Sequence, residues 1–302
     1  MRVYHTAPVG NEHIPIHGSV CIYDSWENTS QGVKAEVGTT GTLVWDSGGN
    51  PFILTNKHVL FPDQFVKLNT TRKIGDAVYQ CADKTQSKSF GTIFKTVSEK
   101  NPWPIKSTDD TVFDQVGDFH DSSLIKSNVG VSDDINGIGK ITGVTEPVIG
   151  MKIKVNGFTS GMQSGKITKI NENVAFPLPK DSTKAVVCKN IFRCDAKTAQ
   201  GDSGSAILTT DNKIVGLLFA GNQAGTETIA CKASAIAKAY GITFVRPANA
   251  KDTVPTPTPA PSGGGSSSIG DISVPDFVRE KGFIIGVALI FGGLIIMSIG
   301  QR

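Results

Sequence analysis

Short apolar runs separated by glycine-rich turns recur along most of this chain, and they restrict its fold more than any other feature. Before the proline-rich segment near the end, only residues 232–240 show the spacing of a helix. The polar segment 46–50 is typical of a hairpin turn between the first two runs. The expected strands cover residues 42–45, 52–55, 123–126, 152–158, 165–170, 184–187, 205–208 and 213–220. Many short strands with frequent turns predict an all-β sandwich or a pair of barrels.

The composition fits a globular protein and gives no electrostatic reason to expect a nucleic-acid partner. The 302 residues allow one large or two small domains, and 39% of them are apolar. Thirty basic and 27 acidic residues leave a net charge of +3, so we expect no nucleic-acid partner. Because the five cysteines contain no Cys-x-x-Cys pair, we also expect no metal site and no cofactor.

The five cysteines are an odd number, so at least one is unpaired within the chain. Our first interpretation is that they are small buried residues in a reducing compartment. If one disulfide forms, we expect Cys194 and Cys231 to make it, because these residues flank a serine-containing turn.

The end of the chain has the composition of a tether followed by a membrane anchor. Residues 248–275 are rich in Pro and Thr and then in Gly and Ser, which predicts an extended and flexible linker. Residues 282–300 carry no charge and are long enough to span a bilayer as one helix. We therefore expect a single-pass membrane protein with a C-terminal anchor.

The side of the membrane on which the globular domain lies is left open by the sequence. The start of the chain lacks an apolar signal peptide, and Arg279 and Lys281 precede the anchor while only Arg302 follows it. These features favour the cytoplasmic side. Two Asn-x-Ser/Thr sites, at Asn28 and Asn69, and the Pro/Thr linker would suit an exterior location.

A serine lies between two glycines in the turn Gly201-Asp-Ser-Gly-Ser205, just before an apolar run. Such a cluster is often only a turn. It also suits a nucleophile, because a serine hydroxyl needs a base and backbone N–H groups that stabilise an oxyanion. The decision between the two depends on the rest of the chain.

The order of histidines and acids along the chain narrows the class of nucleophile. All five histidines precede Ser203, which excludes the Ser–acid–His order of α/β-hydrolases. An Asp–His–Ser order would need an acid such as Asp46 on an α/β fold, which the strand pattern does not predict. The remaining order is His–Asp–Ser. It favours His58 as base and Asp121 as acid, with Asp118 as the alternative acid.

Three segments around these residues resemble the catalytic segments of chymotrypsin-like (trypsin-like) serine peptidases, namely Thr-Asn-Lys-His58-Val-Leu, Asp121-Ser-Ser-Leu-Ile and Gly201-Asp-Ser203-Gly-Ser-Ala. The match is closer to a trypsin-like group found in microbes and their viruses, whose Gly-Asp-Pro-Val-x-Gln segment resembles residues 75–80. The resemblance covers about residues 36–245. We therefore divide the chain into a lead-in with first strands (1–35), a peptidase domain (36–247), the linker and the anchor.

The resemblance implies two six-stranded antiparallel β-barrels with the catalytic residues His58, Asp121 and Ser203 in the cleft between them. It further implies that the amides of Gly201 and Ser203 form an oxyanion hole. Its substrate-binding positions would be Phe219, Ala220 and Gly221 on one pocket wall and Lys197 near the pocket floor, where a buried lysine would favour an acidic substrate side chain.

In secreted members of this class, the acid before the serine pairs with an amino terminus released by activation cleavage. Asp202 stands at that position, but the sequence contains no obvious activation site. The implied function is a membrane-tethered serine endopeptidase acting on protein or peptide substrates. The alternative is a catalytically idle barrel pair that serves as a binding or structural module in a membrane or viral envelope.

Overall fold

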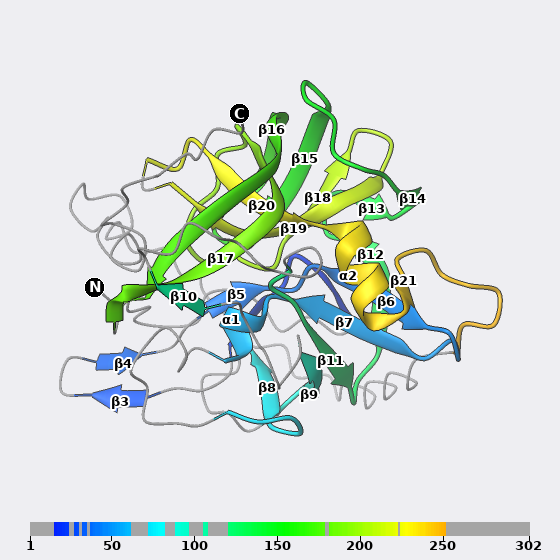
Figure 1. Ribbon diagram of the computed structural model, residues 1–302. Coiled ribbons are helices and arrows are strands. Elements are labelled where there is room, and N and C mark those ends of the chain that lie inside the picture. Colours follow the sequence, from blue (N-terminus) through cyan, green and yellow to red (C-terminus); the bar gives the residue numbers. More distant parts are fainter. Residues whose placement is uncertain are drawn as a thin grey trace, which may run out of the picture.

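The computed structural model describes residues 15–23, 27–29, 32–34, 37–61, 72–81, 88–96, 105–107, 120–178, 181–222 and 224–251. This part is almost entirely β-structure, with the short helices α1 (Lys57–Leu60) and α2 (Ala233–Tyr240) (Figure 1). The strands up to β11 are β1 (Ile16–Gly18), β2 (Cys21–Tyr23), β3 (Glu27–Thr29), β4 (Gly32–Lys34), β5 (Val37–Thr39), β6 (Thr42–Asp46), β7 (Pro51–Thr55), β8 (Ala77–Gln80), β9 (Gly91–Thr96), β10 (Ile105–Ser107) and β11 (Ser123–Ser127). The remaining strands are β12 (Val131–Ile135), β13 (Gly139–Lys140), β14 (Gly143–Val144), β15 (Lys152–Gly157), β16 (Gly161–Leu178), β17 (Asp181–Cys194), β18 (Ala206–Thr209), β19 (Lys213–Gly221), β20 (Thr228–Lys232) and β21 (Ile242–Thr243).

The first barrel closes because β5 and β6 act as one bent strand. β5 pairs with β2, whereas β6 pairs with β7 after a bend at Thr40 and Gly41. The sheet then continues through β11, β9 and β8 back to β2. Counting β5 and β6 together, six antiparallel strands form this ring, with β21 added at the outer edge of β6.

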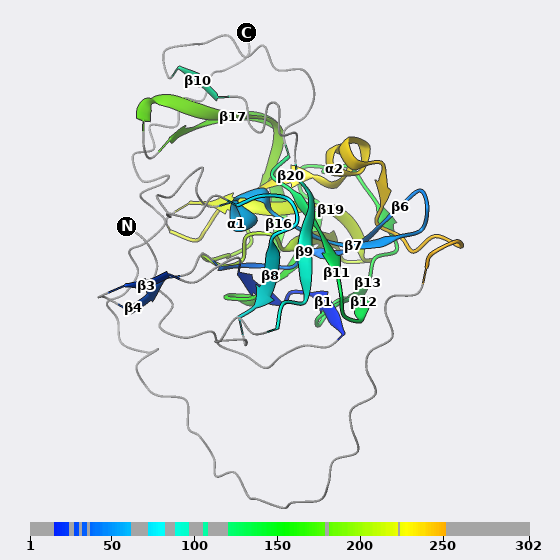
Figure 2. The same ribbon diagram turned by 90° about the horizontal axis from the view of Figure 1, so that it is seen from below.

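The second barrel is a ring of β15, β16, β17, β20, β19 and β18. It closes because β20 pairs with both β17 and β19, and every pairing in the ring is antiparallel. β10 extends the sheet beside the far part of β17, which projects from the body of the molecule in Figure 2. The expectation of an all-β fold built from two six-stranded barrels is confirmed.

Local sequence patterns located α2 and eight of the described strands, two of them only in part. β6, the turn after it and β7 match the expected hairpin, in which the Gly49 amide donates to the Asp46 carbonyl oxygen (3.0 Å). α2 matches the expected helix and ends at Gly241, whose positive φ of 66° suits a C-cap. The sequence analysis found only parts of the long hairpin formed by β16 and β17, and it gave no bounds for the remaining strands, β12 and β20 among them.

The two barrels share one apolar core, which fixes their relative position. Buried side chains of the first barrel pack in the same cluster as side chains of the second and of α2. Val44, Leu54 and Leu124 represent the first barrel, and Leu208 and Leu217 represent the second. Fully burying one such side chain contributes about 1.5–3 kcal/mol, so the barrel interface is an integral part of the core.

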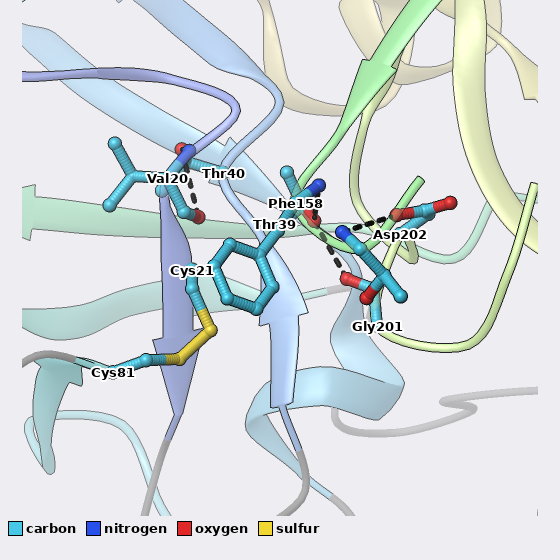
Figure 3. Close-up of a disulfide and its surroundings, with 9 residues drawn as sticks. Val20, Cys21, Thr39, Thr40, Cys81, Phe158, Gly201 and Asp202 are labelled. Atoms are coloured by element: carbon cyan, nitrogen blue, oxygen red, sulfur yellow. Dashed lines mark hydrogen bonds between the residues drawn. A yellow bond between two sulfur atoms is a disulfide. The ribbon is translucent and has the colours of Figure 1, made fainter. Parts of the chain in front are cut away.

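The disulfide predicted from the sequence is wrong. Cys21 on β2 forms a disulfide with Cys81 just after β8, whereas Cys188, Cys194 and Cys231 are free and buried (Figure 3). Cys194 and Cys231 lie in different apolar clusters, so their side chains point to opposite faces of the sheet. β8 brings Cys81 beside Cys21 because both flank the pairing of Ile22 with Gln80.

The linker starts slightly later than expected. Residues 249–251 pack against the turn of the first hairpin, where the Lys251 amide donates to the Gly49 carbonyl oxygen (2.8 Å). The rest of the expected linker and the expected anchor at residues 282–300 lie outside the described residues. Among the described residues, no helix has the length and apolar character needed to cross a membrane.

Candidate active site

His58 and Asp121 form a hydrogen-bonded pair at one end of the first barrel. The His58 ring, through Nδ1, makes a short hydrogen bond with Asp121 Oδ2, and the His58 backbone amide donates to Asp121 Oδ1 (3.1 Å). The Asp121 side chain is 4% exposed and the His58 side chain 24%. With a proton on Nδ1 donated to the carboxylate, Nε2 of the imidazole is left as a proton acceptor.

Strand pairing in the first barrel brings these two residues together. β7 and β11 are antiparallel neighbours, and Thr55 pairs with Ser123 where β7 ends and β11 begins. Because His58 follows β7 and Asp121 precedes β11, both residues emerge at the same edge. The Asn56 side-chain amide donates to the Asp121 carbonyl oxygen (2.6 Å), which adds a second connection between the two segments.

The turn that contains Ser203 is seated against the first barrel. The Thr39 amide donates to the Ser203 carbonyl oxygen (2.7 Å), and the Thr39 hydroxyl donates to the Gly201 carbonyl oxygen (2.7 Å). Gly38 fills the space between the Val59 side chain and the Ser203 carbonyl, since a Cβ there would lie 2.6 Å from Val59 Cγ1 and 3.1 Å from that oxygen. Since Val59 directly follows His58, the serine turn lies beside the helix that carries the imidazole.

Two backbone amides of the serine turn differ from their neighbours in having no acceptor among the residues that the structure describes. The amides of Asp202, Gly204 and Ser205 donate to carbonyl oxygens. Within the described part of the chain, no acceptor binds the amides of Gly201 and Ser203. Gly201 has a φ of 94°, a conformation that a residue with a side chain rarely adopts. Two open N–H groups beside a serine can stabilise a developing oxyanion.

The candidate substrate-binding residues lie on two different elements. Phe219 and Ala220 are buried and Gly221 is exposed. All three lie on β19 after Leu217, which is the last residue of that strand to pair with β18. Gly221 lies close to Thr198, whose hydroxyl would be 3.8 Å from a Cβ at that glycine. These positions are those that the sequence analysis assigned to a pocket wall.

Lys197 is not buried. Its side chain is exposed, so the structure does not support the expected buried lysine at a pocket floor. The polar groups that lie inward in this region are instead the hydroxyls of the partly buried Thr198 and the buried Thr228, which are 2.5 Å apart. Thr228 also donates to the Ala196 carbonyl oxygen (2.9 Å). No local sequence pattern predicts this pair, because the two threonines come from separate segments.

The other candidate groups are less suited to nucleophilic or acid–base roles. Burial raises the pKa of Cys194 to about 11 and that of Cys231 to about 12, and it raises the pKa of Cys188 well above its ordinary value, so these thiols stay protonated at neutral pH. Asp46 caps its turn by accepting from the Asn50 amide (2.8 Å). Asp118 lies outside the described residues. No group of histidine, cysteine and acidic side chains in the described part could hold a metal ion.

The sequence analysis did not predict a group of side chains that contacts the residues on either side of Asp121. The Tyr240 hydroxyl on α2 donates to the Ser122 carbonyl oxygen (2.7 Å), and His120 Nδ1 lies 2.7 Å from the Ser122 hydroxyl. The rings of His120 and Tyr240 meet edge to face with centroids 5.6 Å apart. Burial lowers the pKa of His120 from 6.5 to about 4, so this imidazole is neutral at pH 7. The network supports the backbone on both sides of the acid.

The lowered pKa of the partly buried His120 predicts that the protein is less stable in acid. Above pH 6.5 His120 is neutral in both the folded and the unfolded state, but below that pH the unfolded chain binds the proton first. Stability is therefore lost as pH falls from 6.5 towards the folded pKa of about 4, by about 3 kcal/mol. We expect His120→Asn to remove that part of the loss. Urea unfolding of both proteins between pH 7 and pH 4 measures this difference, and equal pH slopes would contradict a neutral His120 imidazole in the folded state.

Comparisons with known proteins agree with this architecture. The family model described as Trypsin matches residues 25–239. The crystal structure of Nocardiopsis protease (NAPase) is similar with a TM-score of 0.50 and 15% identity, over 76% of this chain and 98% of that one. Thermobifida fusca protease A is similar with a TM-score of 0.50 and 19% identity, over 77% and 99%. The comparison with curated proteins finds no match.

Two closed antiparallel barrels, with a paired histidine and aspartate on one and a serine turn from the other seated beside them, define the chymotrypsin-like class of serine peptidases. Because the family model covers well over half of the 302 residues, the chain belongs to the trypsin family and is a serine peptidase, a hydrolase.

Proposed function

We propose that this peptidase cleaves peptide bonds within protein or peptide substrates through His58, Asp121 and Ser203. The observation that carries the proposal is the hydrogen-bonded pair of His58 and Asp121 beside the serine turn. His58 Nε2 would take the Ser203 hydroxyl proton as Oγ attacks the substrate carbonyl carbon. Asp121 would hold the Nδ1 tautomer and stabilise the imidazolium that forms.

The later steps use the same groups. The amides of Gly201 and Ser203 would stabilise the oxyanion of the tetrahedral intermediate, and the loss of one such donor typically costs about 3 kcal/mol of barrier. His58 would then protonate the leaving amine, which departs and leaves an acyl group on Ser203. A water molecule, deprotonated by His58, would hydrolyse that ester and regenerate the hydroxyl.

Substrate binding would use the part of β19 that runs past the serine turn. An extended substrate can add main-chain hydrogen bonds to a strand while its side chains enter neighbouring pockets. The segment 219–221 offers such backbone, and Thr198 lies beside Gly221. Lys197 would act at most from the exposed rim, because its side chain is not buried.

We further propose that the apolar segment 282–300 tethers the domain to a membrane. The support is its length and lack of charge. Two observations point to opposite answers for the side of the membrane on which the domain lies. Arg279 and Lys281 before the segment favour the cytoplasmic side, whereas the Cys21–Cys81 disulfide favours an oxidising compartment. Digestion of sealed vesicles by an added protease distinguishes the two orientations.

A fluorophosphonate probe tests the nucleophile directly. We expect the folded protein to be labelled on Ser203 and labelling to vanish in Ser203→Ala, because the probe reacts only with a serine activated by a base. The matched control is Ser132→Ala on β12, which removes a hydroxyl from an exposed part of the same domain and should leave labelling unchanged. Mass spectrometry of the labelled peptide gives the position.

The same experiment separates activity from the alternative of an idle module. Absence of labelling in a folded wild-type protein would favour a binding or structural role. Labelling that persists in Ser203→Ala would assign the nucleophile to another residue.

A further inference from the structure

A buried arginine in the second barrel binds two glutamates that come from different strands. The Arg193 side chain on β17 is 4% exposed. Its Nε donates to Glu172 Oε2 on β16, and its Nη1 donates to Glu227 Oε2 (2.6 Å), one residue before β20. The two glutamate side chains are 24% and 25% exposed, so the group lies mostly within the protein. We call these three residues the Arg193 cluster.

The strands around the Arg193 cluster lie side by side in the sheet (Figure 1). β17 pairs with β16 along one edge and with β20 along the other. Arg193 pairs with Ile229, so these two side chains share one face of the sheet, and Glu227 reaches Arg193 on that face. Thr228 lies between Glu227 and Ile229, so its side chain points to the opposite face.

The backbone of Glu227 is joined to the end of β19 that we assign to substrate binding. Gly221 pairs with Thr228, and the Asn222 amide donates to the Glu227 carbonyl oxygen (2.9 Å). A Cβ at Gly221 would lie 2.9 Å from the same oxygen, so the two backbones are in close contact. The Asn222 side-chain oxygen also accepts from the amides of Thr226 (2.9 Å) and Glu227 (3.1 Å). The position of Glu227 therefore determines that of Gly221.

The opposite face of β20 contacts the segment that leads to the serine turn. The Thr228 hydroxyl binds the Thr198 hydroxyl and the Ala196 carbonyl oxygen, as described above. Gly225 lies against the same segment, since a Cβ there would be 3.2 Å from the Thr198 carbonyl oxygen. A shift of Glu227 would thus move Thr228 and the end of β19 together. These are the groups beside which an extended substrate would bind.

The electrostatics of the Arg193 cluster favour a geometric role over a stabilising one. The loss of hydration of three charges offsets much of their mutual attraction, and apolar replacement of such buried groups is often neutral for stability. The guanidinium is planar and its N–H groups have fixed directions, so it binds the two carboxylates in one arrangement. Arg193 therefore holds Glu172 and Glu227, and with them β16 and the start of β20, in a defined relative position.

From this geometry we propose that Arg193 is a positioning residue for substrate binding, which acts through Glu227 on the end of β19 and the start of β20. The inference rests on the proposed peptidase function. Arg193 touches neither the substrate nor the reacting groups, and it acts on binding of the substrate main chain rather than on the chemistry at Ser203. Its loss should therefore weaken the binding of peptides and leave the reactivity of Ser203 unchanged.

The first test removes all three charges together in Arg193→Met/Glu172→Gln/Glu227→Gln, so that no member of the cluster stays charged without its partners. The substrate is a fluorescence-quenched peptide selected from a random library for cleavage by the wild-type protein. We expect kcat/KM to fall about tenfold, mainly through KM, because one or two main-chain hydrogen bonds to the substrate are weakened. The rate of fluorophosphonate labelling should stay at the wild-type value, because this probe has no peptide main chain.

The ratio of peptide kcat/KM to the labelling rate is the decisive quantity, because it does not depend on the fraction of folded protein. A merely structural role would lower both rates in parallel and leave the ratio unchanged. The matched control is Lys213→Met at the other end of β19, where the ion pair with Asp211 (3.1 Å) is exposed on both sides. It should change the ratio by less than about twofold.

The second variant, Glu227→Met, keeps the inference testable if the triple variant does not fold. Arg193 then remains paired with Glu172 but no longer binds the residue before β20. We expect the same fall in the ratio, about tenfold. A wild-type ratio in a folded form of either variant would overturn the inference. If the wild-type protein is neither labelled nor able to cleave any peptide of the library, the proposed peptidase function itself fails.

Discussion

Replacing Asp121 by asparagine should lower kcat about 10⁴-fold while the domain stays folded. Asp121 Oδ2 holds the Nδ1 side of His58, and Oδ1 accepts from the His58 amide. An asparagine can accept only one of these two hydrogen bonds. If its NH₂ group faces Nδ1, the imidazole must carry its proton on Nε2 and can no longer accept one from Ser203. Turnover of a peptide substrate at pH 7, normalised to the folded fraction, measures the effect.

The matched control for this variant is Asp133→Asn on β12. It also removes one carboxylate from the first half of the chain, but that carboxylate is paired at the surface with Lys140 (3.0 Å). We expect it to retain turnover within about twofold, since an ion pair with an exposed lysine contributes little to stability. Wild-type turnover in Asp121→Asn would contradict the assignment of the acid. A large loss in Asp118→Asn instead would transfer the role to that residue.

The strands that the sequence located are those whose pattern is local. β6, β7, β15 and β19 are apolar or alternating runs bounded by turn residues, and period alone is enough to place them. β12 was missed because it is only partly buried and carries two aspartates in five residues. β16 and β17 were found only in part, because their register shifts at several points interrupt the alternation on which a sequence prediction depends.

The residues of the candidate site also fall into two groups: those that a local sequence pattern predicts, and those that only the fold brings together. His58, Asp121 and Ser203 could be proposed from their order and from the segments around them, because each segment carries its own pattern. The contacts that support these three residues could not be predicted from the sequence, because they join segments far apart in the chain. Asp202 is 43 residues from Thr159, whose amide donates to its carboxylate, and Tyr240 is 118 residues from the Ser122 carbonyl that it binds. Lys197 was misplaced for the same reason, since its expected burial depended on a loop path that only the fold determines.

Replacing Gly204 by alanine should destabilise the domain by more than about 4 kcal/mol, a loss that single substitutions reach only at special positions. Gly204 has a φ of 99°. An added Cβ would overlap the Thr39 carbonyl oxygen and lie 2.6 Å from the Thr55 hydroxyl oxygen. Thr39 cannot move away easily, because it pairs with Cys21 on β2 and its amide binds the Ser203 carbonyl. The fraction of Gly204→Ala molecules that still folds should also lose fluorophosphonate labelling, because the same displacement moves Ser203 away from the first barrel.

Gly75→Ala separates the two causes of that loss of stability, which are backbone strain at a positive φ and overlap of the added Cβ with its neighbours. Gly75 has nearly the same φ, 95°, but a Cβ there would meet nothing within 4 Å. It should therefore lose only the backbone strain, about 1–3 kcal/mol, and should keep labelling. Urea unfolding of the two variants gives the difference in the free energy of unfolding, which measures how tightly the serine turn is held against the first barrel. Equal losses in the two variants would mean that the contact between Gly204 and Thr39 is not constrained. The seating of the serine turn on Thr39 would then be too loose to position Ser203 beside His58.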